Sequence, residues 1–477
     1  MVNVLRVPGD LWDILKQRLQ PPQRVENMVV GLLGINHSEG LREFLLRDIH
    51  LPSGEDYVCQ SPMFVQLRDQ RVASLLERAR DYSAFLLAHN HVGRAFFSSM
   101  DEEGIGELMR CYRHFRPGGW LLQMVWGTNG LLLRVANTVE RRWQPVDLIK
   151  VIADEGFFLL RPLNSRLPEN PAPLDVARHH RTLNYLGPRG EEVLRLLTGI
   201  SVGVIGVGGN GAAVTYIAKF LGFRRWVLCD SDRVERHNSN RLFGYREGDD
   251  GKLKTEVVAR ELLAFDPTLS CLTVAEAFPA ERAWEALKGC DLLLCCPDND
   301  YCRSQATQFA SRYLKVLIEM GAGIELDKKS GLPIRVGCQV RLQLPTAKGK
   351  CLVCNGLPTE NLIPPEIEAE KIAQGRAVGY IKDSDLPTPT SVVTLNAMAA
   401  VLACRVLLSY LSGIGKTPDY LFYDDLGMHL VDLSGAYQKQ PDCPICGRHS
   451  NSLFGWGDEL PGHLQILTPE GGKANGF

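Results

Sequence analysis

The chain has 477 residues, of which 45% are hydrophobic and 23% charged, as expected for a soluble globular protein of two or three domains. Its net charge of −2 gives no reason to expect a nucleic acid or an anionic membrane as a partner. No apolar run reaches the ~18 residues of a membrane span, and no basic segment followed by an apolar one opens the chain. Of the 14 cysteines, Cys229, Cys295 and Cys296 fall in buried-looking strands and four others form CxxC pairs, which is typical of a reducing compartment, so we expect a cytoplasmic protein.

The first elements predict an α+β domain over residues 1–162. Residues 9–20 carry apolar side chains at helical spacing, whereas residues 25–35, 41–48 and 84–91 have the pattern of strands. The sequence Thr-Asn-Gly at 128–130 indicates a hairpin turn between two further strands.

Two histidines end the strand at 84–91. His89 and His91 alternate along it and so point to the same face, and Asp101 follows where the next helix begins. Three such ligands can hold one zinc ion and leave a position for water.

This pattern resembles the JAB/JAMM metallopeptidases, which carry H-x-H, a spacer and S-x-x-D and cleave conjugates of ubiquitin-like proteins. His89, His91, Ser98 and Asp101 match that order, and Glu26 is the local candidate for the family's general base. However, Val92 replaces the usual proline, and the spacer is one residue short. The alternatives are an active zinc peptidase and a weak or inactive one that docks a ubiquitin-like protein, and we favour the second.

A linker is predicted over residues 163–175, which contain three prolines among small polar residues. Residues 176–448 then have the features of a second domain. Its first segment, DVARHHRTLNYLG, contributes the two arginines Arg178 and Arg181.

A glycine-rich stretch organises this second domain. Residues 201–214, SVGVIGVGGNGAAV, predict a buried strand that turns sharply into a helix near Asn210. Such a turn brings backbone N–H groups and the positive end of a helix up to a phosphate. Strands and helices alternate after it, which favours a Rossmann-like, mainly parallel α/β sheet. The glycines of the turn are Gly206, Gly208, Gly209 and Gly211.

Polar residues follow the next strand. Asp230 ends it, at about the spacing at which an acid reaches a ribose hydroxyl. A dinucleotide oxidoreductase has no evident use for the basic residues beyond it, whereas an enzyme that stabilises charge on an α-phosphate does. The cluster comprises Asp232, Asn238, Asn240, Arg241 and Lys254.

These motifs resemble the ThiF/MoeB-type adenylyltransferases that activate ubiquitin and its relatives. The resemblance rests on GVGGNG, DSDRVERHNSNR, GKLKTE and CCPDNDYCR, the last with Asp298, Asn299 and Arg303. It implies ATP and Mg²⁺ as cofactors, with Asp230 on the ribose and Asp298 on the magnesium ion. It also implies that Asn240, Arg241 and Lys254 grip the phosphates.

The same resemblance implies a homodimer. In the family, an arginine just before the first nucleotide-binding strand enters the ATP site of the neighbouring subunit. Arg181 matches that position best, with Arg178 as its companion. A solvated basic helix is the alternative.

Four of the 14 cysteines form two CxxC pairs, a strong signal for a closed, structural zinc site. A redox pair would explain one of them but not both. The crossover at 355–391, where many relatives carry a thioester-forming cysteine, has none, and Cys404 lies in an apolar helix where a thiol is inert. Residues 449–477 are glycine-rich and predict a flexible tail. The two pairs are Cys351 with Cys354 and Cys443 with Cys446.

The function predicted is ATP-dependent adenylation of the C-terminal glycine of a ubiquitin-like protein, as the activating enzyme of a conjugation pathway. A ubiquitin-conjugating type of enzyme would then be a further partner. Two alternatives remain: adenylation of a sulfur-carrier protein for cofactor biosynthesis, and a non-catalytic module that binds nucleotide.

Overall fold

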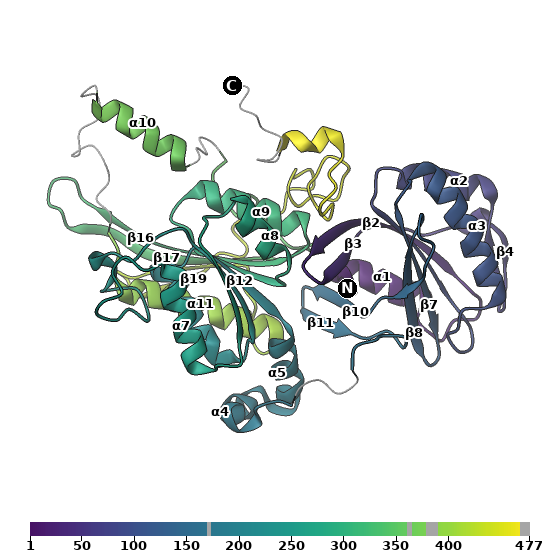
Figure 1. Cartoon of the computed structure of the whole chain (residues 1–477), viewed down its shortest axis with the longest axis horizontal. Helices are drawn as coiled ribbons and strands as arrows, with labels where there is room; N and C mark the ends of the chain where they lie inside the picture. Colours follow the sequence, from purple (N-terminus) through teal and green to yellow (C-terminus); the bar gives the residue numbers. More distant parts are fainter. Residues whose placement is uncertain (169–172, 360–364, 378–389, 468–477) are drawn as a thin grey trace.

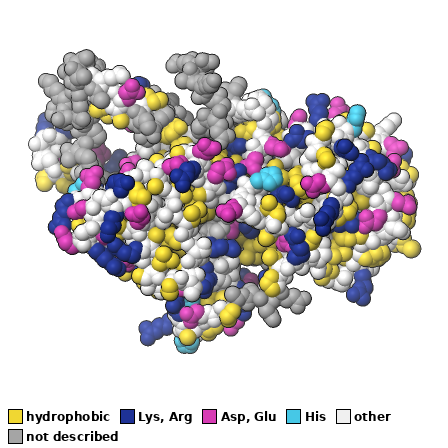
Figure 2. Space-filling model, viewed as in Figure 1, with side chains coloured by type: hydrophobic (Ala, Val, Ile, Leu, Met, Phe, Trp, Pro, Cys, Tyr) yellow, Lys and Arg dark blue, Asp and Glu magenta, His cyan; other side chains and the backbone are white. Residues whose placement is uncertain are grey.

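The computed structural model describes residues 1–168, 173–359, 365–377 and 390–467. Two large sheets lie side by side, the first built from the N-terminal residues and the second from residues 201–432 (Figure 1). On the face seen in Figure 2, basic and acidic side chains are interspersed, in keeping with the near-zero net charge.

Within the described residues, the first sheet is nine-stranded and mixed, in the order β11-β10-β1-β3-β2-β6-β7-β8-β9. Helix α1 packs on one face of it, while α2 and α3 cover the other. The predicted helix at 9–20, the strands and the Thr-Asn-Gly hairpin are all present. The elements are β1 (Val2–Pro8), α1 (Gly9–Leu19), β2 (Met28–Ser38), β3 (Leu41–His50), β4 (Tyr57–Gln60), β5 (Val65–Leu67), α2 (Asp69–Ala79), β6 (Ala84–Asn90), α3 (Ser99–Phe115), β7 (Trp120–Gly127), β8 (Gly130–Asn137), β9 (Gln144–Pro145), β10 (Leu148–Ala153) and β11 (Gly156–Leu160).

The second sheet runs in the order β14-β13-β12-β15-β16-β17-β18-β19. Strands β12 to β16 are parallel, which confirms the predicted mainly parallel sheet, and β17, β18 and β19 continue the sheet antiparallel. The chain leaves β12 toward β13 on one side and reaches β15 on the other, which makes β12 the switch point of the sheet. The elements are α4 (Val176–Leu186), α5 (Gly190–Gly199), β12 (Ser201–Ile205), α6 (Gly209–Ala218), β13 (Arg225–Cys229), α7 (Lys254–Phe265), β14 (Ser270–Val274), α8 (Glu281–Lys288), β15 (Leu292–Cys295), α9 (Asp300–Arg312), β16 (Val316–Leu326), β17 (Pro333–Gln343), α10 (Pro365–Ala377), α11 (Val393–Ser412), β18 (Tyr420–Asp424) and β19 (His429–Asp432).

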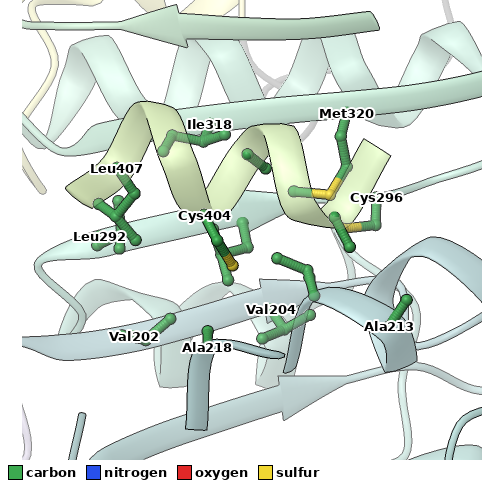
Figure 3. Close-up of a cluster of buried hydrophobic side chains, with 14 of the residues drawn as sticks. Val202, Val204, Ala213, Ala218, Leu292, Cys296, Ile318, Met320, Cys404 and Leu407 are labelled. Atoms are coloured by element: carbon green, nitrogen blue, oxygen red, sulfur yellow. The ribbon is translucent and has the colours of Figure 1, made fainter. Parts of the chain in front are cut away.

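Helix α11 fills the core of this second part. Its residues Cys404 and Leu407 pack against Val204, Leu292 and Ile318 of the sheet (Figure 3). Among the described residues, α11 is the helix long and apolar enough to cross a membrane, with a mean hydropathy of 1.6. More than half of that span is buried inside this fold, so its apolar character is accounted for by packing on the sheet.

The two sheets are joined by fully buried charges. Arg6 of β1 donates to Glu43 of β3 at 2.7 Å and to Asp291, just before β15, at 2.6 Å. Lys150 of β10 reaches the same Asp291 oxygen at 2.6 Å, and Lys315 reaches Glu43 at 2.7 Å. Removing one partner of such a network leaves a buried charge uncompensated, which costs ~3–5 kcal/mol. The two halves therefore pack as one body.

The segment 447–458 lies between the sheets, where the chain is yellow in Figure 1. Leu453, Phe454 and Trp456 are each about 2% exposed or less. Gly457 pairs with Ile35 of β2, and its own N–H donates to the carbonyl of Arg312. The expectation of a flexible tail from residue 449 is thus wrong for this segment, because glycines here permit close backbone contact rather than mobility. Residues 468–477 of the predicted tail, and 169–172 of the predicted linker, lie outside the described residues.

Candidate functional site

The glycine-rich turn follows β12 and leads into α6, as the sequence predicts. Gly206 adopts a φ of +81°, a conformation that favours glycine. A methyl group at Gly211 would lie 2.0 Å from the carbonyl oxygen of Gly206, so the helix starts in contact with the end of the strand. Nothing lies within 4 Å of the corresponding position at Gly208. The turn thus leaves the N-terminus of α6 open to an anion.

Asp230 follows β13, the neighbour of β12, and lies against the turn. Its Oδ2 accepts a hydrogen bond from the N–H of Val207 at 2.6 Å, and its Oδ1 accepts one from the N–H of Asp232 at 2.8 Å. Burial raises the pKa of Asp230, and these two hydrogen bonds oppose that effect. The carboxylate is therefore fixed at the edge of the sheet where β12 and β13 end.

Lys254, the first residue of α7, is paired with Asp232 at 2.7 Å. Asp232 is exposed, so this pair is an exchangeable surface contact. Arg241 donates to the carbonyl of His237 at 2.7 Å and to Asn240 at 3.4 Å.

Three of the other predicted residues hold the surrounding loops. Asn238 accepts from the N–H of Glu235 at 3.0 Å. Asn299 accepts from the N–H of Cys302 at 2.8 Å as the cap of α9, so its amide oxygen is already engaged. Arg303 bonds Glu319 of β16 and the carbonyl of Pro297, each at 2.8 Å, and so fixes the loop after β15.

Asp298 stands exposed in that loop and accepts from Asn299 at 3.0 Å. Because β13, β12 and β15 are adjacent and parallel, the glycine turn, Asp230 and Asp298 share one edge of the sheet. A hard carboxylate oxygen in an open position suits Mg²⁺. The edge therefore combines an anion-binding turn, two acids and a lysine.

The arginines of α4 lie elsewhere. Arg178 pairs with Asp266 at 3.1 Å, a residue that precedes β14 and so lies at the opposite edge of the sheet. Arg181 is exposed on the same short helix. Within a single chain, the structure does not bring Arg181 to the glycine turn.

The four CxxC cysteines meet in one buried cluster. The sulfur atoms of Cys351 and Cys443 are 3.7 Å apart, as are those of Cys354 and Cys446. All four sulfurs lie within 4.8 Å of one another. A tetrahedral Zn–S₄ centre has sulfur–sulfur edges of about 3.8 Å, so these residues fit a closed zinc site.

The N-terminal ligands also converge. His89 Nε2 is 3.0 Å from Asp101 Oδ1, His91 Nε2 is 3.5 Å from Asp101 Oδ2, and the two imidazole nitrogens are 3.2 Å apart. Ser98 caps α3 and donates to Asp101 at 2.7 Å, which aims the carboxylate at the histidines. These bonds lower the pKa of Asp101 against the effect of its burial.

A cavity of about 940 Å³ opens onto this cluster, and Glu26 lines it together with His89, His91 and Asp101. Burial raises the pKa of Glu26, whereas the charges of His91 and His89 lower it, which places Glu26 within electrostatic range of both rings. The altered spacing noted in the sequence therefore does not separate the four residues.

Sequence reasoning missed Asn396 of α11. Its side chain donates to Asn210, inside the glycine-rich motif, at 2.7 Å. The one signal was an asparagine in the first turn of a mainly apolar helix.

Comparison with known proteins places the second part of the chain. The sequence model of the ThiF family matches residues 179–445, more than half of the chain. The SAMP-activating enzyme E1 of Haloferax volcanii is 27% identical over 275 residues, which cover 57% of this chain and 89% of that protein. The sulfur carrier protein adenylyltransferase of Thermus thermophilus is 28% identical over 281 residues, or 57% and 91% of the two chains. Ubiquitin-like modifier-activating enzyme 5 of Oryza sativa subsp. japonica is 24% identical over 259 residues, or 52% and 56%.

Proposed function

The chain belongs to the ThiF family, and we propose that it is an adenylyltransferase that activates the C-terminal glycine of a ubiquitin-like protein with ATP. The observation that carries the proposal is the single sheet edge that gathers the glycine turn, Asp230, Lys254 and Asp298. The names of the relatives, which include activating enzymes and a sulfur-carrier adenylyltransferase, support the substrate class.

In the proposed reaction, a carboxylate oxygen of the carrier protein attacks the α-phosphorus of ATP. A new phosphorus–oxygen bond forms, the bond to the bridging oxygen breaks, and pyrophosphate leaves with its electron pair. The fixed carboxylate of Asp230 accepts from the ribose hydroxyls, and the N-terminus of α6 faces the phosphates. These groups position the ATP and stabilise the charge on its phosphates.

The basic residues stabilise the departing charge. Lys254 exchanges its surface partner Asp232 for phosphate oxygens, and Asn240 and Arg241 add further donors. Mg²⁺, held by Asp298, would supply charge neutralisation on the same oxygens. An exchangeable lysine costs little to redirect, because an exposed ion pair contributes only ~0–1 kcal/mol.

Arg181 is assigned to a second copy of the chain. Its helix lies at the wrong edge of its own sheet, yet its side chain is exposed and its position matches the family's arginine. We therefore propose a homodimer in which each α4 serves the partner's ATP site. A guanidinium there would offset charge as pyrophosphate leaves.

ATP–pyrophosphate exchange in the presence of a ubiquitin-like protein tests the adenylation. Asp298→Ala and Lys254→Ala should each lower exchange at least about a hundredfold, as for loss of one transition-state donor, with unchanged thermal stability. Asp250→Ala, an exposed acid on the loop before Lys254, is the matched control. Exchange at the wild-type rate in Asp298→Ala would refute the assignment. A thiocarboxylate product, rather than a lysine conjugate, would favour the sulfur-carrier pathway.

The N-terminal part supports a second candidate function, because Glu26, His89, His91 and Asp101 meet at one cavity. We propose a JAB/JAMM-like domain in which the histidines and Asp101 hold zinc, and Glu26 takes the proton of a water molecule. Zinc, when bound, would supply the Lewis acid for hydrolysis of an isopeptide or a C-terminal extension. Glu26 lines the same cavity as the histidines, which supports an active peptidase, whereas Val92 and the short spacer support the weak or inactive form that docks a ubiquitin-like protein. Cleavage of a linear fusion by the zinc-loaded chain decides between the two.

A further inference from the structure

Asn396 lies in the first turn of α11, buried to 4% exposure at the point where α11 packs on α6. Its amide nitrogen donates to Oδ1 of Asn210 at 2.7 Å, and its amide oxygen accepts from Ser391 Oγ at 3.1 Å. Asn210 is the second residue of α6, next to the open N-terminus of that helix. A three-membered relay thus runs from the glycine turn to the residue that precedes α11 by two positions.

The glycine at position 209 is explained by the same asparagine. A methyl group there would lie 3.0 to 3.1 Å from the Oδ1, Cγ and Nδ2 atoms of Asn396, tighter than ordinary contact. Gly208 has no such neighbour within 4 Å. The two glycines therefore serve different purposes: Gly208 keeps the outer side of the turn open, and Gly209 admits the asparagine beneath it.

The hydrogen-bonded chain Asn210–Asn396–Ser391 is also anchored to the sheet, through the residue before Ser391. Thr390, next to Ser391, donates to the carbonyl of Ile324 in β16 at 3.2 Å. Residues 390–396 are thereby fixed on one side to the sheet and on the other to the nucleotide turn. Asn210 and Ser391 are linked through Asn396 by two hydrogen bonds.

We propose that Asn396 is a positioning residue that holds the glycine-rich turn in its nucleotide-binding form and couples nucleotide binding to residues 390–392. The inference rests on the ATP site proposed above and adds a regulated element to it. Coupling is reciprocal, so whatever engages residues 390–392 shifts the affinity for nucleotide by the same factor.

The first test measures ATP binding to the full-length protein by calorimetry, without any carrier protein. Asn396→Ala removes one buried hydrogen bond to the turn and should weaken binding about three- to tenfold. Ser409→Ala, a buried polar change at the far end of α11, should leave it unchanged. Unchanged affinity in Asn396→Ala would overturn the inference while leaving the adenylation proposal intact, whereas no ATP binding by the wild type would refute the adenylation proposal itself.

The second test uses the contact at Gly209. Gly209→Ala alone should weaken ATP binding, because its methyl group meets Asn396. If that contact is the cause, Gly209→Ala combined with Asn396→Ala should bind ATP no worse than Asn396→Ala alone. A double variant much weaker than either single one would show that Gly209 faces the phosphates instead, and would overturn the assignment.

A third measurement reads the coupling without activity. Addition of a non-hydrolysable ATP analogue should slow amide hydrogen exchange at residues 390–396 in the wild type, and this protection should be lost in Asn396→Ala. Equal protection in both proteins would show that nucleotide reaches these residues by another route and would contradict the relay.

Discussion

The two metal-ligand clusters of this chain differ in their relation to solvent. The four cysteines are all 0 to 4% exposed, and four sulfur ligands at these distances would leave no open position on a tetrahedral metal ion. The histidine–aspartate cluster offers three ligands and faces a cavity of about 940 Å³. A closed four-thiolate centre holds chain segments together, whereas an open three-ligand centre leaves room for a reacting water. The difference predicts a structural role for the cysteine cluster and a chemical one for the histidine–aspartate cluster.

The cysteine cluster holds more than the two loops that supply its cysteines. Directly after Cys446, Arg448 pairs with Asp10 of α1. Arg47 of β3 donates to the backbone carbonyls of His449 and Phe454, and its guanidinium lies over the ring of Trp456. We therefore expect that zinc bound by the four cysteines would order the segment 447–458 that joins the two sheets.

The largest expected effect comes from breaking the closed cluster. Cys443→Ala should remove the zinc and lower the free energy of unfolding on the order of 5 kcal/mol, below the ~10–16 kcal/mol that zinc contributes to peptides without another core. Metal content and thermal unfolding of the purified protein measure this. Cys111→Ala, an exposed thiol, is the control. Full stability in zinc-free Cys443→Ala would show that the cluster is not structural.

Substitutions in the histidine–aspartate cluster should instead change the rate of hydrolysis and leave the stability of the fold unchanged. Glu26→Gln keeps the size of the side chain and all three metal ligands, so zinc content should be retained while hydrolysis of a ubiquitin-like fusion falls ~10²–10⁴-fold. His91→Ala should lose the metal as well. If Glu26→Gln cleaves as fast as the wild type, Glu26 is not the base; if neither protein cleaves, the docking role is restored.

The features that could be predicted from the sequence are those that depend on residues close together in the chain. The strand, glycine turn and helix at 201–218 follow from residues that are adjacent in the chain, and the CxxC spacing fixes a metal geometry on its own. Asn396 could not be predicted, because Asn210 lies 186 residues away and no periodicity links the two. Arg6 and Asp291 are 285 residues apart and look like surface charges in the sequence. Their role depends on how the two sheets face each other, which local patterns do not encode.

The smallest expected effect concerns the buried charges between the two sheets, and it tests whether these charges hold the sheets together. Burial lowers the pKa of Lys315 to about 8, below its value of 10.5 in an unfolded chain. Between these values Lys315 binds its proton more strongly in the unfolded chain, so this group alone makes stability rise with pH, by at most about 1.4 kcal/mol per pH unit. The buried cysteines and tyrosines act in the opposite direction, because burial raises the pKa of Cys295 and of Tyr410 and the unfolded chain loses these protons first. The pKa of Glu43 and of Asp291 is instead lowered, because the charges of Arg6, Lys150 and Lys315 outweigh the effect of burial. Their contribution is complete above about pH 4.5 and is lost as the pH falls further.

Denaturant unfolding of the full chain from pH 7 to 10.5 measures the alkaline part. Lys315→Met should make the slope of stability against pH less positive than in the wild type, since it replaces the titrating ammonium by an apolar group of similar length. Lys416→Met, at an exposed lysine paired with Asp432, should leave the slope as in the wild type. An unchanged slope in Lys315→Met would mean that Lys315 titrates normally and that the interface is hydrated. The N-terminal sheet could then be expected to separate from the second one, with the open cluster acting independently of the adenylation site.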